Sequence, residues 1–349
     1  MRWTVSRAGP IAATSPWRAA SARAWQTSPR KSFEALSQHL APCLTGHNAK
    51  GGFEPPFSIP VSIHSRPMTL YVSDLDGTLL DAQGRLADST RLGLTRLLDE
   101  GLLFTVASAR HVTSIRQILG DLPLRLPVIG SNGAYISDMA SARHEIVHAI
   151  EPDLAQAVFA LIRQHGLMPF VSTHGAQGDQ LFYQSVHNEA QQSFVDERLR
   201  NSDPRLRHSP RMQDVLSDPA VTLVVVDREG PLAELQAAID AMCGEQVETH
   251  LAEDLYKPGW PWLTVHDRRA TKDQGIKTLA QRYGLEDKEV VVFGDHVNDI
   301  KMLRAAHRGI AVENAIPAVK REAHQVIGHH HEDSVLRFIT EDWQARGRR

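Results

Sequence analysis

The pattern of apolar and polar positions becomes regular only from about residue 68 onward. Short apolar runs alternate there with longer segments whose apolar residues recur every three or four positions. The short runs are typical of buried strands, and the wider spacing is typical of helices packed on a sheet. The pattern predicts strands over residues 70–73, 102–107 and 127–129, and helices over residues 89–100 and 112–119. Strands that alternate with helices predict an α/β fold with a parallel sheet covered on both faces.

The first of these helices carries its own boundary signals. Asp88 precedes it as a candidate N-cap, and Gly101 follows it as a C-terminal stop. We expect it to bury one apolar face, and the residues of that face are Leu92, Leu94, Leu97 and Leu98.

The alternation changes between about residues 150 and 262, where strands and a polar, basic stretch follow one another without the strand–helix rhythm. We interpret this segment as an α+β domain inserted into a doubly wound, Rossmann-like core. The core alternation resumes with a strand at residues 262–266. The expected division is an N-terminal extension over residues 1–67, core over 68–149, inserted cap over 150–262 and core again over 263–349.

The first 67 residues have a different composition. They hold eight of the 19 prolines and no sustained period, and they carry eight basic residues against two acidic ones. Residues 1–33 resemble a transit peptide in composition. The favoured interpretation is an extension outside the fold, with Met68 as the natural first residue. A genuine transit peptide, which would imply import into an organelle, is the alternative.

The remaining residues carry 30 basic and 39 acidic side chains, a balance that argues against a nucleic-acid-binding surface. The longest apolar runs are about six residues, whereas a membrane span needs roughly 18. Two cysteines, Cys43 and Cys243, give no disulfide framework, so a reducing, cytoplasmic location is expected. We expect a monomer or a weak homodimer.

Two carboxylates follow the first predicted strand, in the run Asp74-Leu75-Asp76-Gly77-Thr78-Leu79. Ligands of open α/β sheets bind at the carboxyl ends of strands. Residues i and i+2 leave a strand in the same direction, so Asp74 and Asp76 can divide the work of nucleophile and general acid/base.

Three further polar clusters follow predicted strands. Ser108, in the run Ser108-Ala109-Arg110, can donate its hydroxyl to a phosphoryl oxygen or simply cap a helix. Lys272 begins a helix, where an ammonium can neutralise phosphate or remain solvated. The run Gly294-Asp295-His296-Val297-Asn298-Asp299 offers oxygen ligands of the kind that Mg²⁺ favours, although Asn298 or Asp299 can also serve as a helix cap.

Together, these four clusters resemble the motifs of the haloacid dehalogenase-like superfamily. The position of the insert, Ser131-Asn132-Gly133-Ala134 and Ala311-Val312-Glu313-Asn314-Ala315 are similar to the Cof-type branch, which carries a type IIB cap. The resemblance covers about residues 68–340. One departure is the pair Ser108 and Ala109, where Thr and Gly are commoner; Ser keeps the hydroxyl.

The resemblance implies an Mg²⁺-dependent phosphatase of small phosphate esters that acts through a phospho-aspartyl intermediate. Asp74 would be the nucleophile and a metal ligand, and Asp76 the general acid/base and a metal ligand through its carbonyl. The other implied roles are phosphoryl binding for Ser108, Lys272 and Asn298, substrate contact for Asn132, and metal binding for Asp295 and, directly or through water, Asp299.

Two other functions remain open from the sequence. A phosphomutase of the phosphomannomutase type shares this cap, and a phospho-accepting signalling protein would use the same aspartate without turnover. Asp76 and the cap argue against the second, because a signalling module needs neither. We also expect the run His329-His330-His331-Glu332 to be a solvated turn rather than a metal site, Trp260 and Trp262 to pack where the cap meets the core, and residues 173–180 to face the core and select the substrate.

Overall fold

The computed structural model describes residues 69–254 and 257–346. These described residues belong to one compact unit. The expectations for residues 1–67, and for Met68 as the first residue, lie outside the described residues. The search for a membrane-spanning helix in the described part of the chain found none of sufficient length and apolar character.

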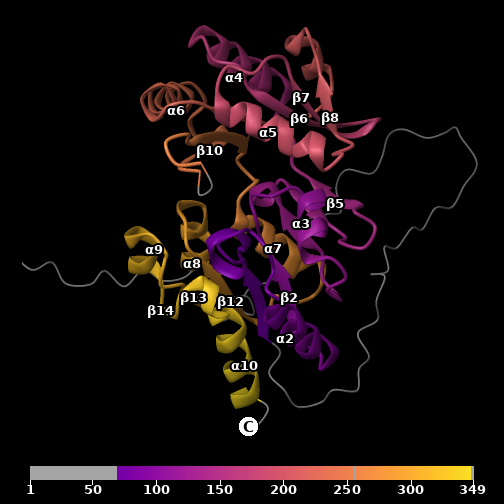
Figure 1. Cartoon of the computed structure of the whole chain (residues 1–349), viewed down its shortest axis with the longest axis vertical. Coiled ribbons are helices and arrows are strands. Elements are labelled where there is room, and N and C mark those ends of the chain that lie inside the picture. Colours follow the sequence, from indigo (N-terminus) through magenta and orange to yellow (C-terminus); the bar gives the residue numbers. More distant parts are fainter. Residues whose placement is uncertain (1–68, 255–256, 347–349) are drawn as a thin grey trace, which may run out of the picture. The chain divides into compact units, whose positions relative to one another are not determined.

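The core sheet has five parallel strands in the order β14-β13-β12-β1-β2. Strand β1, which lies between β12 and β2, is buried along its whole length, which explains why it is apolar without alternation. The strand bounds are β1 Thr69–Ser73, β2 Leu103–Val106, β12 Glu289–Gly294, β13 Arg308–Ala311 and β14 Gln325–Val326. The predicted α/β fold class is confirmed (Figure 1).

Helices pack against one another around this sheet, α2 on α10 and α8 on both α7 and α9. Their bounds are α2 Asp88–Asp99, α3 Val112–Leu119, α7 Lys272–Arg282, α8 Ile300–Ala305, α9 Pro317–Glu322 and α10 Ser334–Arg346. The prediction for α3 is confirmed residue for residue.

Helix α2 departs from the prediction at two residues. Asp88 is its first helical residue and Ala87 is the N-cap, without a side-chain cap. Leu92 is 71% exposed, because Leu94, Leu97 and Leu98 define the buried face and Leu92 lies away from it. The C-terminal stop is confirmed: Gly101 has a φ of 98°, and its N–H donates to Leu98 O.

A small antiparallel sheet, β3-β4-β5, extends the core sheet through a bridge between Ala107 and Ile129. Its strands are β3 Val128–Gly130, β4 Tyr135–Ser137 and β5 His144–Val147. The last two were not predicted, because they are short and β5 is only half-buried, so it lacks an apolar run.

The cap sheet has six strands in the order β10-β11-β9-β6-β7-β8. Apolar residues of its strands alternate between two clusters, one shared with α4 and α6 and the other with α5. The bounds are α4 Pro152–Gln164, β6 Phe170–Gly175, β7 Gly178–Tyr183, α5 Glu189–Arg200, β8 Leu206–His208, β9 Ala220–Val226, α6 Glu229–Cys243, β10 Val247–Ala252 and β11 Trp262–Asp267.

Two expectations for this region are wrong. Strand β11 was expected to resume the core sheet, but it pairs with β10 and β9, so the cap sheet extends to Asp267. Helix α5 was not predicted: it begins before the stretch interpreted as polar and basic, residues 196–211, and runs into it, and just Ala190, Gln191 and Val195 of this helix are buried.

Candidate active site

The turn after β1 places the first pair of carboxylates at the carboxyl edge of the core sheet. Asp74 is 6% exposed, and its N–H donates to Phe293 O of β12. Gly77 has a φ of 72°, and a Cβ there would lie 2.5 Å from Asp295 Oδ2. Only glycine suits this position, because it permits both the left-handed backbone and the close approach of Asp295.

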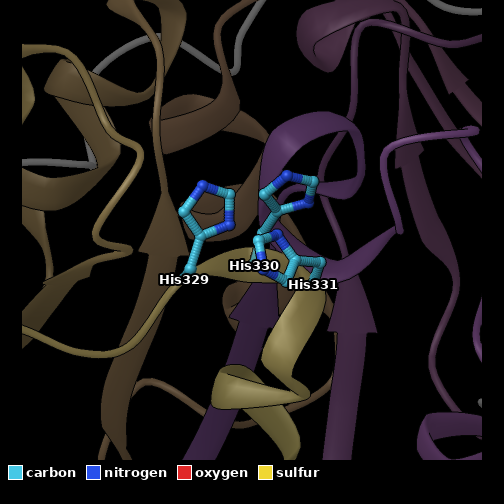
Figure 2. A group of neighbouring side chains, drawn as sticks. All are labelled: His329, His330 and His331. Atoms are coloured by element: carbon cyan, nitrogen blue, oxygen red, sulfur yellow. The ribbon is translucent and has the colours of Figure 1, made fainter.

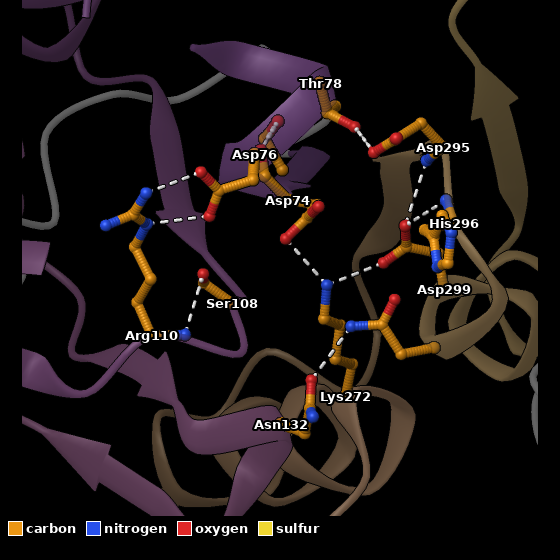
Figure 3. Close-up of polar contacts among 12 residues, drawn as sticks. Asp74, Asp76, Thr78, Ser108, Arg110, Asn132, Lys272, Asp295, His296 and Asp299 are labelled. Atoms are coloured by element: carbon orange, nitrogen blue, oxygen red, sulfur yellow. Dashed lines mark hydrogen bonds and ion pairs between the residues drawn. The ribbon is translucent and has the colours of Figure 1, made fainter. Parts of the chain in front are cut away.

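Lys272 joins two of the strand-end clusters (Figure 3). Its Nζ donates to Asp74 Oδ1 and to Asp299 Oδ1, each at 2.7 Å. The side chain is buried at the first position of α7. Burial alone would lower the pKa of Lys272, but attraction to Asp299 and Asp74 outweighs it and raises that pKa. Lys272 is therefore a fixed cation beside Asp74.

The fourth cluster folds around Asp299. Its Oδ2 accepts the N–H groups of Asp295 and His296, both at 2.9 Å, so Asp299 does act as a cap of the turn. Asp295 Oδ1 accepts the Thr78 hydroxyl at 2.7 Å, which ties the cluster to the turn after β1. A Cβ on Gly294 would lie 2.6 Å from Asp299 Cγ, so this approach also requires glycine.

Three buried carboxylates, Asp74, Asp295 and Asp299, each offer an oxygen within 4.8 Å of the others. Burial raises the pKa of Asp74 well above its usual range despite the attraction of Lys272. Burial, followed by repulsion from Asp299, raises the pKa of Asp295 to about 7. Lys272 contributes one positive charge to this group. The donor set of oxygens and the remaining negative charge fit a hard divalent cation such as Mg²⁺.

Asp76 points to a different partner. Arg110 donates from Nε and Nη2 to the two oxygens of Asp76, each at 2.7 Å, and its backbone N–H donates to Ser108 Oγ at 3.1 Å. The Ser108 bond is local and lies before α3, whose N-cap is His111, so Ser108 is not the helix cap that the sequence left open as an alternative. Arg110 was noted only as a neighbour of Ser108. The pairing of Arg110 with Asp76 joins two strand ends that are 34 residues apart. The one sequence signal for this role of Arg110 was its position just after β2.

Asn132 and Asn298 meet beside this site. Asn298 Nδ2 donates to Asn132 Oδ1 at 3.0 Å, and Asn132 Nδ2 lies 3.5 Å from Nε2 of His266 on cap strand β11. Asn132 has a φ of 56°, in the left-handed region. Asn132 therefore contacts the cap, and its expected contact with the substrate stays a prediction.

The three consecutive histidines lie next to the turn after β1 (Figure 2). His330 N–H donates to Asn314 Oδ1, and Asn314 Nδ2 in turn donates to Gly77 O at 2.7 Å. Trp262 packs on Phe194 with ring centroids 5.0 Å apart, within the cap cluster that includes Trp260. These residues support the turn and the cap, and we assign them no chemistry.

The chain is similar to known proteins over most of its length. The profile of the haloacid dehalogenase-like hydrolases matches residues 71–339. An HMP-PP phosphatase of an Enterobacter species is 28% identical over 76% of this chain and 93% of its own length. A pyridoxal phosphate phosphatase of Escherichia coli is 27% identical over 76% of this chain and 95% of its own.

Solved structures share the fold. A haloacid dehalogenase-like hydrolase from Bacteroides thetaiotaomicron superposes with a TM-score of 0.63 at 18% identity, covering 79% of this chain and 99% of its own. A sugar phosphatase described as subclass IIB superposes with a TM-score of 0.62 at 22% identity, covering 79% and 98%. The expected enzyme class, a hydrolase, is confirmed, and the chain belongs to the haloacid dehalogenase-like hydrolase family.

Proposed function

We propose that this hydrolase is an Mg²⁺-dependent phosphatase that releases phosphate from small phosphorylated metabolites, either sugar phosphates or phosphorylated cofactor precursors. The observation that carries the proposal is the buried Lys272, whose Nζ lies 2.7 Å from both Asp74 and Asp299, beside Asp295. A carboxylate nucleophile can approach an anionic ester only where positive charge is fixed next to it, and this edge of the sheet provides it.

Asp74 and Asp295 would hold Mg²⁺, together with the backbone carbonyl of Asp76. Asp299 engages Lys272 with one oxygen and two backbone N–H groups with the other, so its role is to hold Lys272 and the turn. When bound, Mg²⁺ neutralises phosphoryl oxygens and the carboxylates around them. The expected metal roles of all four aspartates remain proposals.

The first half of the reaction transfers the phosphoryl group to the protein. An oxygen of Asp74 forms a bond to phosphorus while the bond from phosphorus to the ester oxygen breaks. Asp76 gives its proton to that oxygen, which leaves as an alcohol. Ser108 and Lys272 would hold the equatorial oxygens, and Asn298, which donates to Asn132, would contact the same group.

The second half returns the protein to its starting state. Asp76, now ionised, takes a proton from water, and the water oxygen bonds to phosphorus as the bond to Asp74 breaks. Arg110 binds both oxygens of Asp76 in its ionised form. We therefore assign Arg110 as a positioning residue that holds Asp76 for this step and releases it when Asp76 carries a proton.

The relatives guide the choice of substrates. Their names specify HMP-PP, pyridoxal phosphate and, for a Bacillus subtilis relative that is 23% identical, 5-amino-6-(5-phospho-D-ribitylamino)uracil. From these names we propose that the substrate of this chain is a small phosphorylated ring compound. Residues 173–180, which include the turn between β6 and β7, are the proposed segment for discrimination among leaving groups.

The test is phosphate release by the full chain from pyridoxal phosphate and a panel of sugar phosphates, with Mg²⁺ or with chelator. We expect turnover only with the metal and a loss of about 10³-fold or more in Asp74→Asn. Asp287→Asn, on an exposed side chain, is the matched control and keeps full activity. Metal-independent turnover, or an active Asp74→Asn, would refute the mechanism. A requirement for a bisphosphate activator would instead favour the phosphomutase.

A further inference from the structure

A second group of ligand-type side chains lies away from the aspartates of the active site, where the hairpin of β6 and β7 meets the core. Asp179 of β7 is at its centre. Its Oδ2 lies 2.7 Å from His144 Nε2 and 3.0 Å from His111 Nε2, and its Oδ1 lies 2.7 Å from His174 Nδ1. His111 caps α3 and His144 begins β5, so the group joins core and cap elements.

We propose that this group, which we call the Asp179 cluster, is a binding site for a transition metal ion such as Zn²⁺. Three imidazole nitrogens and one carboxylate form a donor set that Zn²⁺ accepts in four-coordinate sites, whereas Mg²⁺ favours oxygen ligands. The site is thus distinct in chemistry from the oxygen-rich group around Asp295.

The cluster is largely buried, has an aromatic ring on one side and is reached from solvent on another. The side chains of His111, His144 and Asp179 are only 9%, 6% and 17% exposed. Tyr135 stacks on His144 with ring centroids 4.3 Å apart and forms an aromatic wall. His174 is 35% exposed, which leaves a path from solvent to the carboxylate.

Hydrogen bonds on the far side of the rings decide which nitrogens can ligate. His144 Nδ1 lies 2.7 Å from Ser137 Oγ, so this ring can keep its proton on Nδ1 and present the Nε2 lone pair to an ion. His111 Nε2 is buried without a well-aligned hydrogen bond, and burial lowers the pKa of His111 to about 4, so the ring is neutral near pH 7.

Ligation by His111 would break one hydrogen bond. Its Nδ1 lies 3.2 Å from both the backbone N–H and the hydroxyl of Thr113. Ligation through Nε2 requires the proton on Nδ1, which can then donate only to the hydroxyl, so the Thr113 N–H would lose its acceptor. The ligand atoms of His111, His144 and Asp179 nevertheless lie within 4.8 Å of one another, so we assign these three as the principal ligands and His174, on the other oxygen of Asp179, as the fourth.

An ion would also spread the cluster slightly. Donor atoms in a tetrahedral Zn²⁺ site lie roughly 3.3 Å apart, given bonds of about 2.0–2.1 Å. The present separations of 2.7 to 3.0 Å are those of hydrogen bonds. Each ring nitrogen would move about half an ångström away from the carboxylate oxygen. His174 would also have to approach the other two rings, because the group whose ligand atoms lie within 4.8 Å of one another consists of His111, His144 and Asp179. His174 and Asp179 are cross-strand neighbours beside the turn of their hairpin.

The experiment uses the full chain with His329 and His331 replaced by Gln, which removes the other histidine group, in excess Mg²⁺ to fill the carboxylate site. Co²⁺ is titrated and followed by its visible absorption, then displaced with Zn²⁺. We expect one equivalent of Co²⁺ with the intense bands of a four-coordinate ion. No substrate is present, so the result does not depend on the proposed phosphatase activity.

Variants locate the site. Asp179→Asn, His144→Gln and the more exposed His174→Gln should each abolish the bands, and Ser137→Ala should weaken binding by roughly 10–100-fold. His165→Gln, on an exposed histidine of the cap, is the matched control and should bind like the parent. Circular dichroism without metal shows whether each variant is folded. Absence of bands in the parent, or unchanged binding in folded His144→Gln and Asp179→Asn, overturns the proposal.

Discussion

Arg110 is the residue whose role depends most on geometry. Its guanidinium makes two parallel bonds of 2.7 Å to Asp76, an arrangement that a lysine ammonium cannot reproduce. A loosely held general base loses the alignment that the hydrolytic step needs. We expect Arg110→Lys to lower kcat by roughly 10–100-fold, since a displacement of about 1 Å can cost about 100-fold.

The distinguishing measurement is kcat as a function of Mg²⁺ concentration. Because Arg110 acts through Asp76, the Mg²⁺ midpoint should stay unchanged while the plateau falls. Arg116→Lys, whose partner is an exposed backbone carbonyl, serves as the control. A shifted Mg²⁺ midpoint with a normal plateau would show that Arg110 serves the metal site instead.

His266 gives the pH dependence that can be assigned to one residue. It is 3% exposed, and burial, assisted by His250, lowers its pKa from the ordinary 6.5 to about 3. Between these values the unfolded chain binds a proton that the folded chain does not, so stability is lost as pH falls below 6.5. From about pH 7.5 to pH 5 the expected loss is about 2 kcal/mol.

Urea unfolding at both pH values, for wild type and His266→Gln, isolates this contribution. The variant should lose about 2 kcal/mol less than wild type on acidification, whatever its stability at the higher pH. Equal losses in the two proteins would mean that His266 is not the residue that titrates.

At the scale of elements, the start of α7 shows how one turn positions the site. Gly133 has a φ of 104°, and a Cβ there would lie 2.8 Å from the carbonyl carbon of Thr271, the residue before Lys272. Backbone cannot move aside as a flexible side chain can. We therefore expect Gly133→Ala to shift the first turn of α7, destabilise the fold by about 2 kcal/mol or more and lower kcat.

Gly284, just beyond the other end of α7, is the matched control. Its φ is 63°, but a Cβ would meet nothing within 4 Å. Gly284→Ala should lose only about 1 kcal/mol from backbone strain and keep its kcat. Chemical denaturation and steady-state kinetics on both variants check the comparison. Similar losses in the two would indicate that φ, rather than the contact with Thr271, governs Gly133.

The elements also show where sequence reasoning succeeds. Strands such as β1 are buried on both faces, so their residues are consecutively apolar and can be recognised in the sequence. The apolar residues of α3 recur with a clear helical period. An apolar strand does not say which sheet it joins, and β11 was assigned to the wrong one. Helix α5 buries so few residues that its sequence shows no helical spacing of apolar positions. The strand-end aspartates could be found, whereas the Arg110 pairing depends on side-chain packing between distant strands.

For the molecule as a whole, the buried carboxylates that would bind the metal lower the stability of the fold when no metal is bound. Without a metal ion, burial and then repulsion from Asp299 make the charge on Asp295 unfavourable and raise its pKa to about 7. Asp295→Asn removes the charge while keeping a side chain of similar shape. In chelator at about pH 8 we expect this variant to be more stable than wild type.

Mg²⁺ should reverse the order. An ion that binds only the folded chain adds about 2.7 kcal/mol at 100 times its Kd, and Asp295→Asn loses this gain with the ligand. We therefore expect the order of the unfolding temperatures to reverse: Asp295→Asn unfolds at the higher temperature in chelator, and wild type does so in Mg²⁺. Thermal unfolding of both proteins in both conditions measures this. Asp287→Asn, on the exposed surface, should follow wild type in both conditions. A variant less stable than wild type in chelator would mean that Asp295 stabilises the fold through its bond to Thr78, and that the carboxylates are not in conflict.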